Sequence, residues 1–376
     1  MEFIIEQGIF HQAIQDVSRA VSSKTLSPIL SGIKITADKD KIALLATNSD
    51  LTIEKVIPVC CQQSHRLQII HSGSVVVSAR YLGQVIKKLS GEIHIKGIAL
   101  NKIKLISNGI EANMNGLDSI EFPPPPILDD SKDISMPFLD FKRMVKQTLF
   151  AVSKSDTRPV LTGVHLSLEN GRFSCTATNS HRLAFSRGTV DSKETVSCVV
   201  PFAALNECSK VTDIDHGNMK LYITKQYIAF QFPSITLFSR LIEGNYPNVE
   251  SLIPKEARTT LTLNKELLKQ GIDRASLFAS ASDNNKILLE VIEGLQLKIC
   301  SSSTEYGEIA EVQDIVSLNG ESELTVTVDG NFMMDALKAI GEDEVQLSYS
   351  GSMKPLLLQA MDSGMQFHLI SPVRTA

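Results

Sequence analysis

The chain lacks the features on which several protein classes depend. Its six cysteines form no C-x-x-C pair and have no histidines at zinc-finger spacing, which argues against a metal knuckle. No apolar run approaches the roughly 20 residues that a membrane-spanning helix needs. The start, Met1-Glu2-Phe3, has no basic stretch followed by an apolar core, as a secretion signal would. We expect a cytoplasmic protein with reduced, mostly buried cysteines and no metal or cofactor.

Signatures of nucleotide-binding and hydrolytic enzymes are also missing. The patterns G-x-x-x-x-G-K-[ST], G-x-G-x-x-G, H-E-x-x-H and G-x-S-x-G are all absent. One cluster is compatible with a nucleophile and a base: Ser180-His181-Arg182, with Ser153 and Asp156 upstream. An enzyme that uses Ser180, His181 and Asp156 therefore remains an alternative.

The chain does contain an internal repeat. The segment Ala20-Val21-Ser22-Ser23 followed by Pro28-Ile29-Leu30-Ser31-Gly32 returns as Ala151-Val152-Ser153-Lys154 followed by Pro159-Val160-Leu161-Thr162-Gly163. Ala46-Thr47-Asn48-Ser49 returns as Ala177-Thr178-Asn179-Ser180, at the same offset of 131 residues (151 − 20). A register kept this long indicates copies of one structural unit. The shared Ala-Thr-Asn-Ser predicts a strand end and turn, in which Asn and Ser bond to nearby backbone groups. Only the second copy continues with His181-Arg182, so the shared part is interpreted as structural.

Each copy mixes short strands with two amphipathic helices. Period-two patterning predicts strands at 33–36, 51–56 and 93–96, and further strands are expected at 221–223 and 228–232. Apolar residues three and four apart predict the helices. Their ranges are 10–20, 79–89, 138–150, 202–210, 264–278 and 331–340. The predicted fold class is α+β, with helices packed on antiparallel sheets.

Length and punctuation place three copies in tandem. A chain of 376 residues is too long for one core and fits three units of about 130. Phe122 precedes four prolines, which favour a stiff segment between domains, and Tyr246-Pro247 and Ile253-Pro254 mark the end of the second copy. The predicted domains are 1–126, 127–254 and 255–376.

Charge is distributed unevenly along the chain. The net charge is −5, yet the six predicted helices together hold six more basic than acidic residues. Their cations include Arg80, Lys87, Lys88, Lys142, Arg143, Lys146, Lys269 and Arg274. If these helices line one surface, their cations would contact the phosphates of a polyanion without reading its bases. No helix-turn-helix or aromatic stacking platform points to specific base recognition.

Five segments together resemble the bacterial sliding clamp family, the β subunit of DNA polymerase III, over essentially the full length. They are Ser27 to Gly32, Thr157 to Gly163, Ala177 to Ala184, Glu243-Gly244-Asn245-Tyr246-Pro247 and Pro372-Val373-Arg374. The resemblance implies three clamp domains per chain and a head-to-tail homodimer whose six domains form a ring around duplex DNA. It implies a processivity factor without catalysis of its own, loaded by a separate clamp loader.

The resemblance also assigns residues to three sites. A cleft for short peptides of the replicative polymerase and other clamp-binding proteins would use Leu161, Thr178, His181, Arg182, Leu183, Pro247, Leu252, Phe332, Met353, Pro355, Pro372, Val373 and Arg374. Sequence-independent DNA contacts would use Lys24, Arg80 and Arg158. The dimer interface would use Ala112, Met114, Leu277 and Phe278.

Three positions depart from the family pattern. Ser371 stands where an apolar residue usually precedes the Pro-x-Arg ending, which predicts a weaker cleft. Ala112 stands where an aromatic is common, so it would bury less apolar area at the interface. The tetraproline is also unusual, and together these features suggest a second, specialised clamp. A clamp-like interaction protein that binds partners but not DNA is the third functional class considered.

Overall fold

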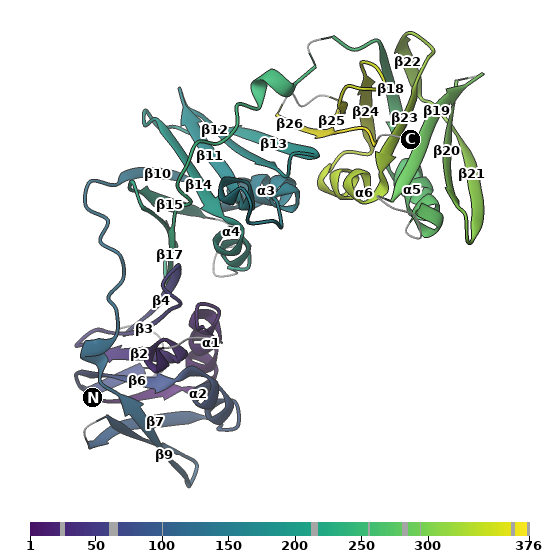
Figure 1. Cartoon of the computed structure of the whole chain (residues 1–376). Helices are drawn as coiled ribbons and strands as arrows, with labels where there is room; N and C mark the ends of the chain where they lie inside the picture. The colour runs from purple at the N-terminus through teal and green to yellow at the C-terminus, as the bar shows by residue number, and fades with distance from the viewer. Residues whose placement is uncertain are drawn as a thin grey trace. The chain divides into compact units, whose positions relative to one another are not determined.

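The computed structural model describes residues 1–22, 27–59, 67–99, 101–211, 217–254, 256–279, 285–293, 295–361 and 365–373. They form two compact units (Figure 1). The first unit contains Met1–Phe138 and Lys210–Leu241, and the second contains Leu139–Ser209 and Ile242–Ala376. The middle repeat contributes to both units, because its strands extend the sheets of its neighbours.

The helices confirm the predicted pattern of two per repeat. They are α1 (Gln7–Ser18), α2 (Ala79–Ile86), α3 (Phe138–Thr148), α4 (Phe202–Ser209), α5 (Lys265–Ala279) and α6 (Gly330–Ala339). Helix α1 begins three residues before the predicted start. Its first residue is held by a tertiary contact, since the Gln7 backbone N–H donates to the Gly91 carbonyl over 2.9 Å and its side chain donates to the Ile86 carbonyl.

The strands of the first repeat are β1 (Glu2–Glu6), β2 (Gly32–Ala37), β3 (Lys41–Thr47), β4 (Leu51–Pro58), β5 (Leu67–His71), β6 (Gly73–Ser78), β7 (Glu92–Ala99), β8 (Lys102–Ser107) and β9 (Ile110–Leu117). Those of the second are β10 (Lys132–Pro137), β11 (Gly163–Glu169), β12 (Arg172–Thr178), β13 (Arg182–Thr189), β14 (Val196–Pro201), β15 (Asn218–Ile223), β16 (Tyr227–Gln231) and β17 (Ile235–Arg240). Those of the third are β18 (Thr259–Asn264), β19 (Lys286–Ile292), β20 (Gln296–Ser303), β21 (Gly307–Asp314), β22 (Ser317–Gly320), β23 (Thr325–Asp329), β24 (Glu344–Tyr349), β25 (Leu356–Ala360) and β26 (Gln366–Ile370). The five predicted strands are all confirmed.

The described strands assemble into three sheets with antiparallel ladders. The largest has the order β10-β15-β16-β17-β4-β3-β2-β6-β9-β8-β7-β1-β5. The second runs β14-β11-β12-β13-β26-β25-β24-β18-β22, and the third runs β21-β20-β19-β23. In Figure 1, α5 and α6 lie beside the strands of the third repeat. The architecture is therefore the predicted α+β class.

Alternating burial explains why each sheet holds its helices. In β2 and β7 the isoleucines at positions 33, 35, 93 and 95 are fully buried, while their neighbours are less so. In the third repeat, Leu268 and Ile272 of α5 and Met333 and Leu337 of α6 join one apolar cluster with the strands. The helices are thus held by packing of their apolar faces rather than by intrinsic propensity.

Before the tetraproline, the chain is anchored to the first repeat. Phe122 is 2% exposed and packs with Leu45 and Val76. Pro123 to Pro126 follow without regular secondary structure, as a proline run without backbone donors requires. The end of the first repeat is thereby fixed by one buried aromatic side chain.

Three expectations from the sequence concern the state of the cysteines, membrane-spanning helices and metal sites. The described cysteines are free: Cys175 and Cys208 are buried, Cys198 and Cys300 are half-buried, and Cys60 and Cys61 lie outside the described residues. Burial raises the pKa of the Cys198 thiol to about 12. No helix in the described ranges is long and apolar enough to cross a membrane, and no group of three metal-ligating side chains is placed there to hold an ion.

Candidate functional site

The repeated Ala-Thr-Asn-Ser forms the same turn in both copies. The Asn48 side chain accepts the backbone N–H groups of Asp50 and Leu51, and Asn179 accepts those of His181 and Arg182. In both copies the threonine hydroxyl before the asparagine donates to the carbonyl four residues ahead. The serine that follows has positive φ, 80° at position 49 and 75° at position 180. The predicted turn is confirmed as a structural device.

Each turn directs a strand into a neighbouring repeat. Strand β4 pairs with β17 from Leu51↔Ser239 to Lys55↔Ile235. Strand β13 pairs with β26 from Arg182↔Ile370 to Ser186↔Gln366. Arg182 and Ile370 each lie 131 positions after their counterparts Leu51 and Ser239 (182 − 51 and 370 − 239). The two connections between repeats are therefore copies of one junction, and the figure shows β17 beside β4 (Figure 1).

The second junction joins repeats two and three through Arg182. Its guanidinium pairs with the Asp335 carboxylate at 2.6 Å and also donates to the Phe150 carbonyl. The charged carbon lies 4.6 Å from the Phe332 ring centroid and 5.2 Å from that of Phe150. Only 10% of the Arg182 side chain is exposed. The strand end of one repeat is thus bonded to helix α6 of the next.

A histidine lies behind this ion pair. His368, in β26, is 1% exposed, and its Nε2 lies 2.9 Å from the Gln366 side-chain nitrogen. Burial, and secondarily the Arg182 charge, lower the pKa of His368 to about 3. The ring is therefore neutral, with Nε2 accepting from the amide, so Arg182 is the one cation beside Asp335 and their charges balance.

The C-terminal segment crosses the end of this junction. The Ser371 N–H donates to the His181 carbonyl over 2.9 Å, and the Val373 N–H donates to the Thr327 carbonyl over 2.8 Å. Residues 371–373 therefore bridge the turn of the second repeat and strand β23 of the third. Six predicted cleft residues are brought together by these contacts and by the Arg182 contacts: His181, Arg182, Leu183, Phe332, Pro372 and Val373.

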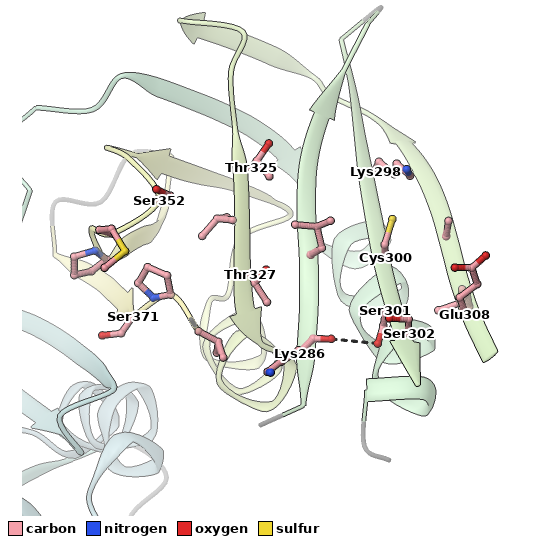
Figure 2. A pocket seen from close by; sticks show the side chains of 18 residues that line it. Lys286, Lys298, Cys300, Ser301, Ser302, Glu308, Thr325, Thr327, Ser352 and Ser371 are labelled. Carbon is pink, nitrogen blue, oxygen red and sulfur yellow. Dashed lines mark hydrogen bonds between the residues drawn. The ribbon is translucent and has the colours of Figure 1, made fainter. Parts of the chain in front are cut away.

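Beside this segment lies an open groove of about 1560 Å³. Its lining includes four predicted cleft residues, Met353, Pro355, Pro372 and Val373, together with Ser371. Figure 2 shows Ser352 and Ser371 on one side of it, Lys298, Cys300 and Glu308 on the other, and Thr325 and Thr327 between them. Met353 is 71% exposed, so a large apolar side chain is open to solvent at the groove.

The remaining predicted cleft residues have different environments. Leu161, Thr178 and Leu183 are buried, whereas Pro247 is exposed and Leu252 is 49% exposed. Pro247 follows Tyr246, whose ring stacks on His165 with centroids 5.0 Å apart. Arg374 lies outside the described residues. Of these predicted cleft residues, three are thus buried and two are exposed.

A second surface lies between helices α1 and α2. A shallow groove of about 470 Å³ is lined there by His11, Arg19, Arg80, Lys87 and uncharged side chains. Within this lining Arg19 is paired with Asp16. On other helices Arg143 is paired with Asp140, Lys269 with Glu266 and Arg274 with Glu311. The α1–α2 groove is therefore a basic surface of the first unit.

Comparisons with known proteins cover the whole chain. Models of the N-terminal, central and C-terminal domains of the DNA polymerase III beta subunit match residues 1–126, 136–248 and 250–374. The beta sliding clamp of Bacillus subtilis is 37% identical over 380 residues, with all of both chains covered. That of Staphylococcus aureus is 34% identical over 379 residues, again with full coverage.

The chain belongs to the DNA polymerase III beta-subunit family, the bacterial sliding clamps.

Solved structures agree with this assignment. A crystal structure of the DNA polymerase sliding clamp from Bacillus subtilis superposes with a TM-score of 0.96 at 36% identity, with both chains covered in full. The DNA polymerase III beta chain of Streptococcus pneumoniae gives 0.94 at 32% identity, again over both full chains. The three tandem clamp domains expected from the repeat are therefore present.

As a clamp, the chain has several strand edges that no described strand fills, and two of them belong to β9 and β21. Strand β21 ends its sheet. Strand β9 pairs with β8 along its length, but on its other edge only Gly116 and Leu117 pair, with β6. The two strands share one burial pattern, in which exposed and half-exposed residues alternate. The predicted interface residues Ala112 and Met114 are half-exposed in β9.

Partners of Arg182 were missed by sequence reasoning. Asp335 lies 153 residues from Arg182 in the chain, so no local pattern reports the pair. The one available signal is that Asp335 follows Phe332 by three positions, which places both on one face of a helix. Phe150 was recognised only as the end of the predicted helix 138–150.

The alternative enzymatic cluster has little geometric support. The backbone N–H of Ser180 donates to Thr178 and that of His181 donates to Asn179, so both residues are part of the turn. Asp156 lies in the exposed loop between Ser153 and Thr157. Within the described part of the chain, no hydrogen bond links Ser180, His181 and Asp156 to one another.

Proposed function

We propose that two chains close head to tail into a ring that encircles duplex DNA and tethers the replicative polymerase, without catalysis of its own. The observation that carries this proposal is the repeated junction. Repeats one and two are joined by β17 with β4, and repeats two and three by β26 with β13. A third junction of the same kind would join the corresponding strands of the first and third repeats.

Those corresponding strands are β9 and β21. In the β8–β9 hairpin, the pair next to the turn is Ser107↔Ile110. The equivalent residues of the β16–β17 hairpin are Phe232, directly after β16, and Ile235, whose carbonyl accepts the Phe232 N–H. Ile110 to Met114 of β9 then take the place of Ile235 to Ser239, the segment of β17 that pairs with β4. Strand β21 follows β20 as β4 follows β3 and β13 follows β12. Pairing β9 with β21 of a second chain repeats the junction and satisfies both edges.

Side chains beside these edges suit such an interface. Leu277 is 73% exposed on α5, and Phe278 is half-exposed. Helix α5 is tied to β21 through the bidentate Arg274–Glu311 pair, with both contacts at 2.6 Å. We place Ala112, Met114, Leu277 and Phe278 at this interface, where burying each large apolar side chain contributes about 1.5–3 kcal/mol.

Contact with DNA is assigned to the helices. Arg80 and Lys87 line the α1–α2 groove, and Arg158 is exposed at the start of the turn before Pro159. Lys24 lies outside the described residues and is retained as a proposed contact. Phosphate contacts without base recognition allow sliding on any sequence.

The cleft at the second junction is proposed as the tether. Apolar side chains with few polar anchors are what a short peptide site needs, and the polymerase, the clamp loader and other clamp-binding proteins would share it. A peptide bound there keeps its protein close to a ring that cannot leave the strand, so processivity arises from effective concentration.

Retention on DNA tests the encircling ring. Loaded protein should remain on a nicked circular plasmid in 1 M NaCl and be lost once the plasmid is cut to a linear form, because a topological link resists salt while phosphate contacts do not. Equal loss from both forms would show that the chain binds partners without encircling DNA. Hydrolysis of ester or nucleotide substrates that disappears in the His181→Ala variant would instead favour an enzyme.

Solution mass tests ring closure. Sedimentation should give about twice the chain mass of 41.2 kDa at micromolar concentration. Met114→Lys in β9 should shift the protein toward monomer, while Lys220→Gln, an exposed position in β15, should not. A monomer at every concentration would contradict the third junction.

Three further assignments belong to this proposal. The domains are placed at 1–126, 127–254 and 255–376, which the matched family ranges support. A cytoplasmic location follows from a role on chromosomal DNA. Ser371, Ala112 and the tetraproline are consistent with a specialised second clamp, and Ser371 indeed lines the groove beside the cleft.

A further inference from the structure

Each repeat carries an equivalent set of three residues that lie side by side on one face of its sheet. One residue is on a central strand, and each of the other two lies directly opposite it on a neighbouring strand. In repeat order, with the central residue first, the sets are Lys34, Leu45 and Val76; His165, Thr176 and Val199; and Leu288, Cys300 and Thr327. Directly opposed residues of antiparallel strands share a face, so we refer to each set as a sheet-face triad.

The chain leaves each repeat past the same member of its triad. In repeat order, the pairs formed there are Leu117 with Val76, Ile242 with Val199 and Val373 with Thr327. The second residue of each pair lies three positions before a helix, which is α2, α4 or α6. The three triads are therefore equivalent in both strand register and chain path.

In the first two repeats, an aromatic residue followed by proline covers the triad. Phe122, five residues after Leu117 (122 − 117), packs on the two flanking members of the first triad. Tyr246, four residues after Ile242 (246 − 242), stacks on His165 of the second triad with ring centroids 5.0 Å apart and planes inclined by 10°. Proline follows both aromatic residues. The chain thus fills the same place twice with an aromatic–proline pair.

The third triad is open by comparison. The flanking residues of the first two triads are at most 7% exposed, whereas Cys300 and Thr327 of the third are half-buried. All three members of the third triad line the groove of about 1560 Å³, and the described residues that line it include no aromatic ring. Figure 2 shows Cys300 and Thr327 in this groove. The third triad therefore presents to solvent the surface that its counterparts bury.

Side chains of the third triad suit an aromatic ring. Leu288 is apolar, and a free cysteine such as Cys300 packs as a small hydrophobic residue. Met353, which is 71% exposed, belongs to the same lining, and thioethers make favourable contacts with ring edges. Lys298 of the lining lies 3.9 Å from Glu290, so its charge is balanced. These contacts favour a neutral ring over a charged side chain.

We propose that the third triad binds an aromatic side chain followed by proline, carried on an extended segment of a clamp-binding protein. The groove shares Met353, Pro372 and Val373 with the predicted peptide cleft, so the inference rests on the proposed tethering and adds a second anchor to it. Proline suits the position after the ring, because it has no N–H and cannot extend a strand ladder past the triad. The partner thus supplies what Phe122 and Tyr246 supply within the chain.

Cys300 reports on occupancy of the triad, because a bound ring would cover its thiol. The probe is acetyl-Gly-Asn-Tyr-Pro-Asn-amide, which copies residues 244–248, and the matched peptide has Ala in place of Tyr. Iodoacetamide labelling of the full chain, followed by mass spectrometry of its digest, gives the rate at Cys300. We expect the Tyr peptide to halve that rate at a concentration about tenfold lower than the Ala peptide requires, since burying one ring contributes a factor of this order.

Two substitutions of Leu288 separate a ring site from general crowding. Leu288→His places the residue of the second triad under the ring and should keep the preference for the Tyr peptide. Leu288→Glu places a carboxylate there and should abolish that preference, while Lys220→Gln on β15 should change nothing. An unchanged labelling rate at Cys198 on β14 shows that each variant remains folded.

The outcomes separate this inference from the proposed function. The aromatic site is overturned by equal protection from both peptides, by no protection at millimolar concentration, or by a preference that survives in Leu288→Glu. A preference lost in Leu288→His contradicts the equivalence of the triads. Retention on circular plasmid is measured without these peptides, so its loss counts against the ring while protection of Cys300 still stands.

Discussion

The Arg182–Asp335 pair predicts an asymmetric response to mutation. The Arg182 side chain is 10% exposed and that of Asp335 is 40% exposed. Replacing Asp335 leaves a guanidinium held between Phe150 and Phe332 without its counter-charge. Replacing Arg182 leaves a carboxylate that water already reaches. We therefore expect Asp335→Leu to destabilise the protein more than Arg182→Met.

The size of the effect follows from the partial burial. Breaking a fully buried pair by removing one partner costs about 3–5 kcal/mol, while an exposed pair contributes about 0.2–1 kcal/mol. With one partner buried and the other part-exposed, Asp335→Leu should cost about 2–3 kcal/mol. Adding Arg182→Met should recover about 1 kcal/mol, because two apolar side chains then meet between the aromatic rings.

Urea unfolding of the two single variants and the double variant measures the coupling energy. Arg143 and Asp140 on α3 supply a matched control, since their side chains are 62% and 49% exposed at 2.9 Å. That control cycle should give about 0.3–0.5 kcal/mol. The reasoning is refuted if Arg182→Met is the more damaging single change, or if the two cycles give the same coupling.

Three further outcomes are expected. Because His368 is kept neutral with a pKa of about 3, against 6.5 when unfolded, the unfolded chain binds the extra proton between these values. Stability should hold above pH 6.5 and fall below it by up to about 1.4 kcal/mol per pH unit, and His368→Gln should flatten that slope in urea titrations at pH 7.5 and 5.0. Asn48→Ala and Asn179→Ala should each cost about 1–2 kcal/mol in thermal unfolding, since both remove the same two bonds; clearly unequal losses would mean that the turns are not equivalent. Arg80→Gln with Lys87→Gln should lower the slope of log affinity for duplex DNA against log salt by about 2, and an unchanged slope would place the DNA elsewhere.

Local structure was predictable because its determinants are local. Apolar residues three and four apart located all six helices to within a few residues. The differences lie at the ends. Helix α2 finishes at Ile86 rather than position 89, and the N–H groups of Lys88 and Leu89 turn to carbonyls three residues back. Such fraying depends on tertiary surroundings rather than on periodicity.

The candidate site was predictable only through family resemblance. Spacing alone could not join Arg182 to Asp335, which lies 153 residues away on a helix of the next repeat, or Thr327 to Val373, which lies 46 residues further along the chain (373 − 327). The departure at Ser371 was visible in the sequence, but its position in the groove lining beside Met353 and Pro372 required the structure. Lys24 and Arg374 lie outside the described residues, so their proposed roles rest on the resemblance.

The two equivalent junctions have a consequence for how the three copies diverged. Each is a ladder of main-chain amides, and every residue except proline carries the same donor and acceptor. Side chains along the ladder are free to change, as Leu51 and Arg182 show at one equivalent position. Divergence of the residues therefore hides the relation of the third copy to the other two in the sequence, while the spacing of its backbone elements still shows it.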